Sequence, residues 1–182
     1  MEKLELKHIA PYFAYGLKCE ILNYKCDYVG EKYGIINGYY FYAGEPHYTF
    51  KTREESGKRG DLIKPILRPL SDLIKEIEFG GEKFIPIERL LDIKTKIDWS
   101  YSDYLKVDKT VNEYRVTFNT NERKPWFGYR SDKNFFFSLD LYGNIKHVEN
   151  QLELFEKMFE WGFDVNDLIG KGLAVDINTL SE

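Results

Sequence analysis

The residues whose spacing most suggests chemistry are four glutamates near the C-terminus. Glu149, Glu153, Glu156 and Glu160 recur at steps of four, three and four residues. On an α-helix this spacing places all four carboxylates along one ridge. Like charges so placed destabilise a helix by about 0.2–0.5 kcal/mol per pair, so helix stability does not explain the ridge. We expect basic groups against it, either from this chain or from a partner with a basic surface; the alternative is a ridge that is simply solvated.

A second candidate surface combines basic and aromatic residues between positions 39 and 68. Its aromatic members are the run Tyr39–Tyr42, and its basic members are Lys51, Arg53, Lys58, Arg59, Lys64 and Arg68. Aromatic rings can stack on bases while lysine and arginine hold phosphates, which is the chemistry of nucleic-acid binding. Glu54, Glu55 and Asp61 dilute the basic cluster. Solvated loops are therefore the alternative interpretation of the same residues.

Residues for catalysis or cofactor binding form no recognisable motif. The chain has no phosphate-binding loop and no nucleophile elbow. His8, His47 and His147 lie far apart in the sequence, so the usual zinc spacings are missing. A site that brings His47 to Cys19 or Cys26 in space stays open. We predict no catalytic residues, no metal and no cofactor.

The glutamates would be positioned by one long helix, predicted from Asn144 to Trp161. Apolar residues recur there at steps of three and four, namely Ile145, Val148, Leu152, Phe155 and Phe159. Such a stripe is typical of a helix that lies on a core. A smaller apolar set, Leu154, Met158 and Trp161, lies on a separate face. The sequence therefore predicts a helix with a buried stripe beside its acidic ridge.

The rest of the chain predicts antiparallel strands with short helices in the middle. Alternating or aromatic residues indicate strands within residues 17–26, 33–42, 47–50, 114–118, 126–129 and 134–140. Asn37-Gly38 predicts a hairpin turn and residues 43–46 a second turn. The polar stretch Lys51–Asp61 predicts a mobile loop. Short helices are expected after Leu70, from Pro86 and from Asp164, the last followed by an extended tail.

The length and the charge of the chain limit the classes of protein to which it can belong. A chain of 182 residues is sufficient for one α+β domain with a full core. The net charge is −4, and the segment from Asp140 onward carries −6 of it, so the remainder carries +2. Only two cysteines are present, and no apolar run resembles a signal peptide or a membrane span. We therefore expect a cytoplasmic protein that does not contact a membrane.

Three segments resemble stretches of small uncharacterised proteins from phages and prophages of Bacteroidota-type bacteria. They are Leu6–Leu17, Lys64–Leu73 and Gly170–Leu180. The family has no assigned activity, so the resemblance implies a setting, namely a phage or mobile element inside a bacterial cell. Small phage accessory proteins commonly bind a host or phage macromolecule, and some inhibit defence nucleases.

These observations predict a non-enzymatic, phage-type accessory protein. Its antiparallel strand meanders would pack against the long C-terminal helix within a single domain, residues 1–182. It would bind a host macromolecule such as a defence nuclease through the glutamate ridge, and could thereby inhibit it. The alternative is a nucleic-acid-binding protein that uses the basic and aromatic region at 39–68.

Overall fold

The computed structural model describes residues 3–22, 32–51, 53–95, 105–118, 126–140, 142, 144–148 and 150–180. Its helices and antiparallel sheets confirm the α+β class. Contacts divide the chain into two compact units. The first unit combines Met1–Pro69 with Phe159–Glu182, and the second comprises Leu70–Met158. That residues 1–182 behave as one domain stays a prediction.

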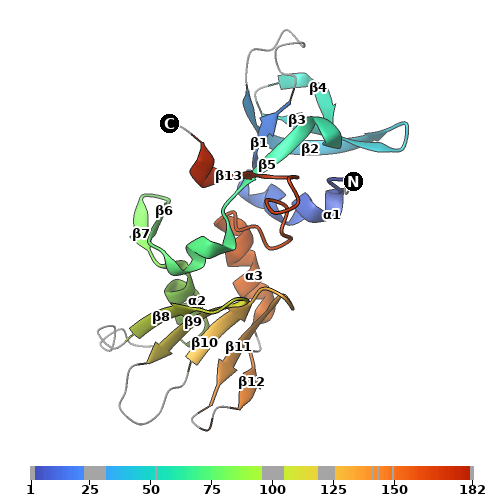
Figure 1. Ribbon diagram of the computed structural model, residues 1–182. Coiled ribbons are helices and arrows are strands. Elements are labelled where there is room, and N and C mark those ends of the chain that lie inside the picture. Colours follow the sequence, from blue (N-terminus) through green and yellow to red (C-terminus); the bar gives the residue numbers. More distant parts are fainter. Residues whose placement is uncertain are drawn as a thin grey trace. The chain divides into compact units, whose positions relative to one another are not determined.

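The first unit is built on a six-stranded sheet in the order β13-β5-β1-β2-β3-β4 (Figure 1). Its strands are β1 (Lys18–Ile21), β2 (Tyr33–Tyr42), β3 (Glu45–Phe50), β4 (Arg53–Arg59), β5 (Ile63–Leu67) and β13 (Val175–Asp176). Its helices are α1 (Leu6–Ile9) and the short 3-10 turns η1 (Ala10–Tyr15), η3 (Gly60–Leu62) and η6 (Ile177–Thr179). Neighbouring strands are antiparallel, except that β13 runs parallel to β5.

The core of the first unit lies on one face of this sheet, called the inner face below. Alternate residues of the strands point into it, because side chains of a strand alternate between faces. Its largest buried members are Tyr12, Tyr48, Phe50, Ile9, Ile21, Ile36 and Leu67. Residues from α1, η1 and the C-terminal segment pack against these strand residues. The opposite, outer face is therefore the side of the sheet left for other contacts.

The β2–β3 hairpin corrects one predicted turn and confirms another. Ala43 and Gly44 have φ of 52° and 82°, as a two-residue type I′ hairpin turn requires. Asn37 and Gly38, predicted as a turn, instead lie inside β2, where the pairing with β3 shifts by one residue. The Thr49 hydroxyl donates to Asn37 Oδ1 at 2.7 Å beside this irregularity. A β-bulge thus takes the place of the predicted turn.

The predicted loop Lys51–Asp61 is also wrong over most of its length. Residues 53–59 form β4, whose backbone pairs with β3 through His47 and Arg59 among other positions. The loop was predicted from polar composition alone. A strand at the edge of a sheet can also be polar, so composition did not distinguish the two. Charged residues are in fact common on such edges, where they oppose pairing with another chain.

The C-terminal segment closes the inner face as a loop rather than as the predicted short helix. Residues 161–174 form turns and bends with one isolated bridge at Phe163. The buried Asp164 carboxylate accepts the N–H groups of Leu168 and Ile169 at 2.8 and 2.7 Å. The Tyr12 hydroxyl donates to the Phe163 carbonyl at 2.6 Å. Asp164 therefore accepts backbone N–H groups as a helix N-cap would, but these bonds stabilise a loop instead of a helix.

The chain leaves and re-enters the first unit at adjacent points. The Arg68 N–H donates to the Gly162 carbonyl at 2.7 Å, and the Asp164 N–H donates to the Arg68 carbonyl at 2.8 Å. Arg68 and Phe163 form an isolated parallel bridge there. The second unit is thus inserted between two segments that hydrogen-bond to each other.

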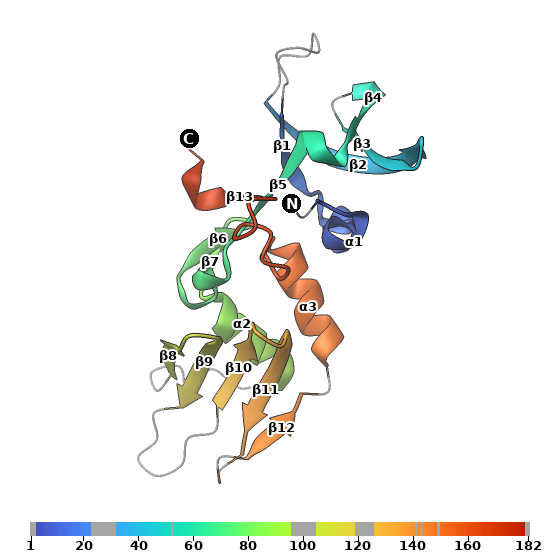
Figure 2. The ribbon, with the colours of Figure 1, turned by 45° about the vertical axis from the view of Figure 1, so that its right-hand side comes forward.

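The second unit contains a five-stranded antiparallel sheet whose strands are adjacent in chain order (Figure 2). The strands are β8 (Leu105–Lys109), β9 (Glu113–Phe118), β10 (Trp126–Arg130), β11 (Phe135–Leu139) and β12 (Ile145–His147). Before them come η4 (Leu70–Ile74), the small hairpin β6 (Ile77–Phe79) and β7 (Glu82–Phe84), and α2 (Pro86–Thr95). The helix α3 (Gln151–Glu160) follows the sheet. The predicted strands at 114–118, 126–129 and 134–140 are confirmed.

Aromatic residues form the core of the second unit. Phe127 and Phe136 stack with ring centroids 5.7 Å apart, and Tyr129 lies 5.0 Å from Phe136. Phe155 of α3 meets the Phe136 ring edge-on at 5.2 Å. The Gln151 side chain bonds both the N–H and the carbonyl of Phe136. Helix α3 is thereby fixed to the sheet by a ring and an amide one turn apart.

The predicted helix Asn144–Trp161 is wrong in its first half. Residues 145–147 form β12, because the Asp140 carboxylate accepts the Tyr142 and Asn144 N–H groups and turns the chain back onto β11. Ile145 and Leu152, predicted as buried, are 63% and 73% exposed. Within α3 the smaller set supplies the buried residues Leu154 and Met158. Both the predicted stripe and the smaller apolar set follow a spacing of three and four residues, so spacing alone did not show which of the two sets is buried.

Candidate functional site

The turn end of the β2–β3 hairpin exposes four successive aromatic side chains. Tyr39, Tyr40, Phe41 and Tyr42 are 47, 45, 61 and 68% exposed. The strand β1 pairs with β2 only over residues 33–35, so this part of β2 extends past it. Both views show the turn reaching beyond β1 and β5 (Figures 1 and 2). Four exposed rings are therefore presented at the end of a paired hairpin.

The bulge in β2 decides which rings share a face. Ile36 pairs with the buried Phe50, and after the bulge it is Tyr39 that pairs with the buried Tyr48. Tyr39 and Phe41 therefore follow the inner face, where Phe13 lies 5.9 Å from the Tyr39 ring. Tyr40 and Tyr42 consequently follow the outer face.

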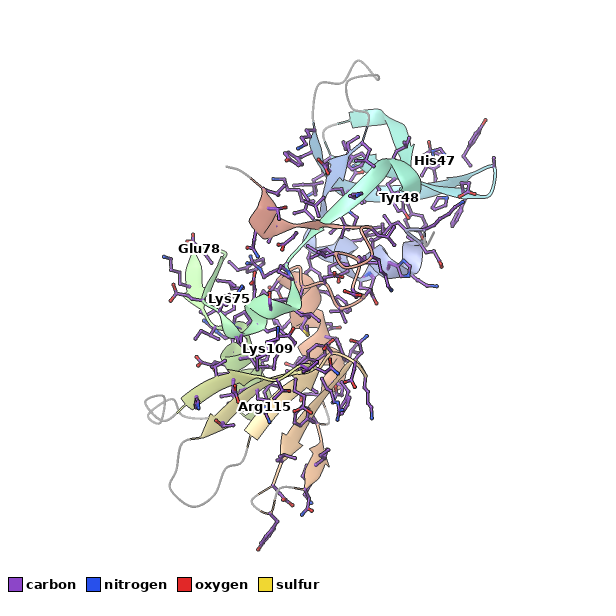
Figure 3. All side chains as sticks on the ribbon, in the orientation of Figure 1. His47, Tyr48, Lys75, Glu78, Lys109 and Arg115 are labelled. Carbon is purple, nitrogen blue, oxygen red and sulfur yellow. The ribbon has the colours of Figure 1, made fainter. Side chains whose placement is uncertain are left out.

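His47 joins the two outer tyrosines into one aromatic group. It is stacked on Tyr40 at 5.3 Å and meets Tyr42 edge-on at 5.7 Å. Figure 3 labels His47 and its neighbour Tyr48 on β3. Tyr48 is fully buried and its hydroxyl has no hydrogen-bond partner among the described residues, and burial raises its pKa to about 12. The two neighbours thus have opposite roles, one on the surface and one in the core.

Lysines and a further tyrosine continue the outer face toward β1 and β5. Lys18 and Lys32 each place an ammonium group 5.1 Å from the Tyr33 ring centroid. Lys32 also pairs with Glu20 at 3.1 Å. In the pairing of β1 with β5, Glu20 lies opposite Lys64. The outer face therefore combines rings along β2 with cationic side chains beside one of them, Tyr33.

The predicted basic cluster is only partly brought to this face. Lys51 is exposed after β3, and Lys64 occupies an outer position in β5. Arg53, Lys58 and Arg59 are residues of β4, and their side chains lie outside the described part of the structure. Arg68 lies at the bridge to Phe163.

Sequence reasoning missed Lys18, Lys32, Tyr33 and His47 as members of the outer face. Lys18, Tyr33 and His47 belong to β1, β2 and β3, and Lys32 directly precedes β2. Only the pairing register of these strands brings the four residues to one face. The alternation of Lys18, Cys19 and Glu20 was a usable signal, since it predicts that Lys18 and Glu20 point away from the core.

The glutamate ridge is present in part. Glu149 lies outside the described residues. Glu153 and Glu156 are exposed on α3, where the Asn150 side chain donates to Glu153 at 3.1 Å, and Glu160 is half-buried. Leu152 is exposed next to Glu153. The described part of the ridge thus consists of two exposed carboxylates and one half-buried carboxylate, with an exposed apolar side chain next to it.

The histidine and cysteine groups do not assemble a reactive centre in the described structure. Cys19 is buried on the inner face of β1, whereas His47 is on the outer face, and Cys26 lies outside the described residues. Burial raises the pKa of the Cys19 thiol, which disfavours the reactive thiolate. No group of three or more metal-binding side chains occurs among the described residues.

The chain matches no protein-family model, no curated protein and no solved structure. In the part of the chain that the structure describes, none of the helices is long and apolar enough to span a membrane.

Proposed function

We propose that this chain is a binding protein without catalysis, and that it contacts a macromolecule through the aromatic end of the β2–β3 hairpin. The exposure of Tyr39–Tyr42 carries this proposal. A contiguous exposed apolar patch costs solubility and commonly marks a contact site. Tyrosine is also among the residues that contribute most to binding energy at interfaces, because it offers a large rigid ring with a polar end.

The setting implied by the resemblance gives this binding a role. A phage-type accessory protein would act in the bacterial cytoplasm on a host macromolecule, such as a defence nuclease, and inhibit it by occupying a surface that it needs. The protein requires no cofactor for that role. The paired hairpin supports it, since a surface held by a hydrogen-bonded ladder loses little conformational entropy on binding.

Affinity capture from bacterial lysate tests the proposal. The wild type is compared with the double variant Tyr40→Ser and Tyr42→Ser, and with Tyr142→Ser as a matched control at an exposed tyrosine of the second unit. The hairpin variant should lose the captured macromolecule, while the control should retain it. The same captured set with all three proteins would overturn the proposal.

The exposed part of the glutamate ridge favours a second surface for the same function. Glu153 and Glu156 with the exposed Leu152 would contact a partner that presents a basic surface. Replacing Glu149, Glu153, Glu156 and Glu160 by glutamine should weaken capture of such a partner, most strongly at low salt. Glu78→Gln, an exposed glutamate in β6, serves as the control. Unchanged capture by the fourfold variant would remove this surface.

A further inference from the structure

We propose that the outer face of the six-stranded sheet binds single-stranded nucleic acid, with bases on the rings of Tyr40, Tyr42 and Tyr33 and phosphates on Lys18, Lys32 and Lys64. This inference rests on the proposed function, because it names the occupant of part of the same surface. It differs from the basic region at 39–68, since it is defined by the register of the strands.

The outer rings lie at two places along one strand, with Tyr33 seven residues before the pair Tyr40 and Tyr42. On the outer face, β2 presents Tyr33 before the bulge and Tyr40 and Tyr42 after it. Two residues along a strand span about 6.6 Å, so Tyr40 and Tyr42 offer separate positions for two bases. His47 covers part of Tyr40, which is still 45% exposed, and adds a third flat ring. The outer face thus supplies a row of stacking positions.

Cationic groups gather at the Tyr33 end of the outer face. The two ammonium groups at 5.1 Å from Tyr33 belong to Lys18 and Lys32, and the side chain of Lys18 is exposed. The only carboxylate that pairs with them among the described contacts, Glu20, is matched by Lys32 at 3.1 Å. Lys64 lies opposite Glu20 on the next strand. The local charge beside Tyr33 is therefore positive although the whole chain is acidic.

The mixture of lysine and tyrosine favours nucleic acid over protein as the occupant. Lysine is depleted in the cores of protein–protein interfaces, where its strong hydration is costly to remove. Single-stranded nucleic acid binds where cationic side chains track the phosphates and aromatic rings accept the bases. One exposed carboxylate, Glu45, pairs with Tyr42 across the hairpin and opposes an anionic ligand. Its removal is therefore a test of the charge argument.

The proposal is tested with fluorescently labelled single strands of mixed sequence, one DNA and one RNA, titrated with the full chain at about 50 mM salt. We expect binding at micromolar protein for at least one of the two strands. A duplex of the same sequence should bind less well, because its bases are already stacked on one another. No binding of either single strand would overturn the inference.

Variants separate the rings from the charges. Tyr40→Ala and Tyr42→Ala should each weaken binding about 5-fold to 150-fold, the range found for loss of one stacked base. Lys18→Gln should lower the slope of log K against log salt by about 0.7, the value for one phosphate contact on a single strand. Glu45→Gln should tighten binding.

The controls are Tyr142→Ala and Lys133→Gln, both exposed in the second unit. Neither should change the affinity or the salt slope. Equal losses from Tyr142→Ala and Tyr42→Ala would overturn the assignment to the outer face.

Failure of the nucleic-acid proposal can be distinguished from failure of the proposed function. If ring variants lose a captured protein while no strand binds, the occupant is a protein, and only the further inference falls. If neither protein capture nor strand binding depends on Tyr40 and Tyr42, both proposals fall.

Discussion

The two sheets of this molecule use the same kind of side chain in opposite ways. In the five-stranded sheet, Phe127, Tyr129 and Phe136 form one face, and Phe155 of α3 closes over them. In the six-stranded sheet, the rings of Tyr40 and Tyr42 lie on a face that remains exposed. The difference lies in what packs on each group, since helix α3 contacts the first, while the second lies at the turn end of a hairpin. An aromatic residue in a strand therefore contributes to stability where another element packs on it, and is available for binding where none does.

The inner faces of the two sheets differ as well. The second unit closes its inner face with α3, whose own backbone bonds are internal to the helix. In the first unit, part of the inner face is closed by the loop 161–174, which relies on side chains such as Asp164 and Tyr12 to satisfy its backbone groups. Polar side chains should accordingly carry more of the stability in the first unit, and rings more of it in the second.

The largest effect should come from removing a buried ring of the second unit. Phe136→Ala removes a fully buried ring that contacts Phe127, Tyr129 and Phe155. We expect a loss of about 3–5 kcal/mol in the free energy of unfolding, from lost burial and the cavity left behind. Tyr42→Ala at the hairpin end should change it by less than about 0.5 kcal/mol. Denaturant titration measures both, and similar losses would break the comparison between the two aromatic groups.

A smaller effect is expected at the buried carboxylate of the first unit. Asp164→Asn leaves one acceptor oxygen where two N–H groups now bond, so we expect a loss of about 1–3 kcal/mol near neutral pH. Thermal unfolding of the full chain measures it. No loss would show that the loop holds itself by its apolar contacts.

The same carboxylate predicts a pH dependence. Burial raises the pKa of Asp164 above its ordinary 3.8, although its backbone hydrogen bonds lower it. The folded state therefore holds this proton to higher pH than the unfolded state does. The advantage of wild type over Asp164→Asn should fall as pH rises from about 4 through the raised pKa, and then stay constant. A difference that increases over this window would contradict the assignment.

The smallest effect compares two tyrosine hydroxyls in the core of the first unit. Tyr12→Phe removes the bond to the Phe163 carbonyl and should cost about 1 kcal/mol. Tyr48→Phe removes a buried hydroxyl that has no partner among the described residues, so stability should be unchanged or rise by up to about 1 kcal/mol. Equal losses from both variants, measured by denaturant titration, would show that Tyr48 has a polar contact after all.

Strand positions were predictable where alternation was strong. Tyr114, Val116 and Phe118 alternate with polar residues, and they lie in β9 as expected. Asn144–Val148 could not be separated from the helix that follows, because Ile145 and Val148 fit a helical spacing. The turn made by Asp140 overrides that spacing, and side-chain-to-backbone bonds of this kind are read from sequence only as a local preference.

The candidate site was predictable in its composition but not in its geometry. The aromatic run Tyr39–Tyr42 was evident as strand residues near basic ones. Which of the rings face outward depends on the bulge beside Asn37, which the sequence presents as a turn signal. For the glutamate ridge, the spacing predicted that Glu153, Glu156 and Glu160 share one helix, and all three lie in α3, whereas Glu149 is outside the described residues.

The adjacency of Arg68 and Gly162 has a consequence for the order in which the chain can fold during synthesis. Residues 70–158 are contiguous, so every partner needed by the second unit has been made before Phe159 is added. The first unit must wait, because β13 and the loop held by Asp164 are translated after the second unit. Domains generally fold as they emerge. Here the inserted unit would be complete while the sheet that begins the chain still has an uncovered inner face.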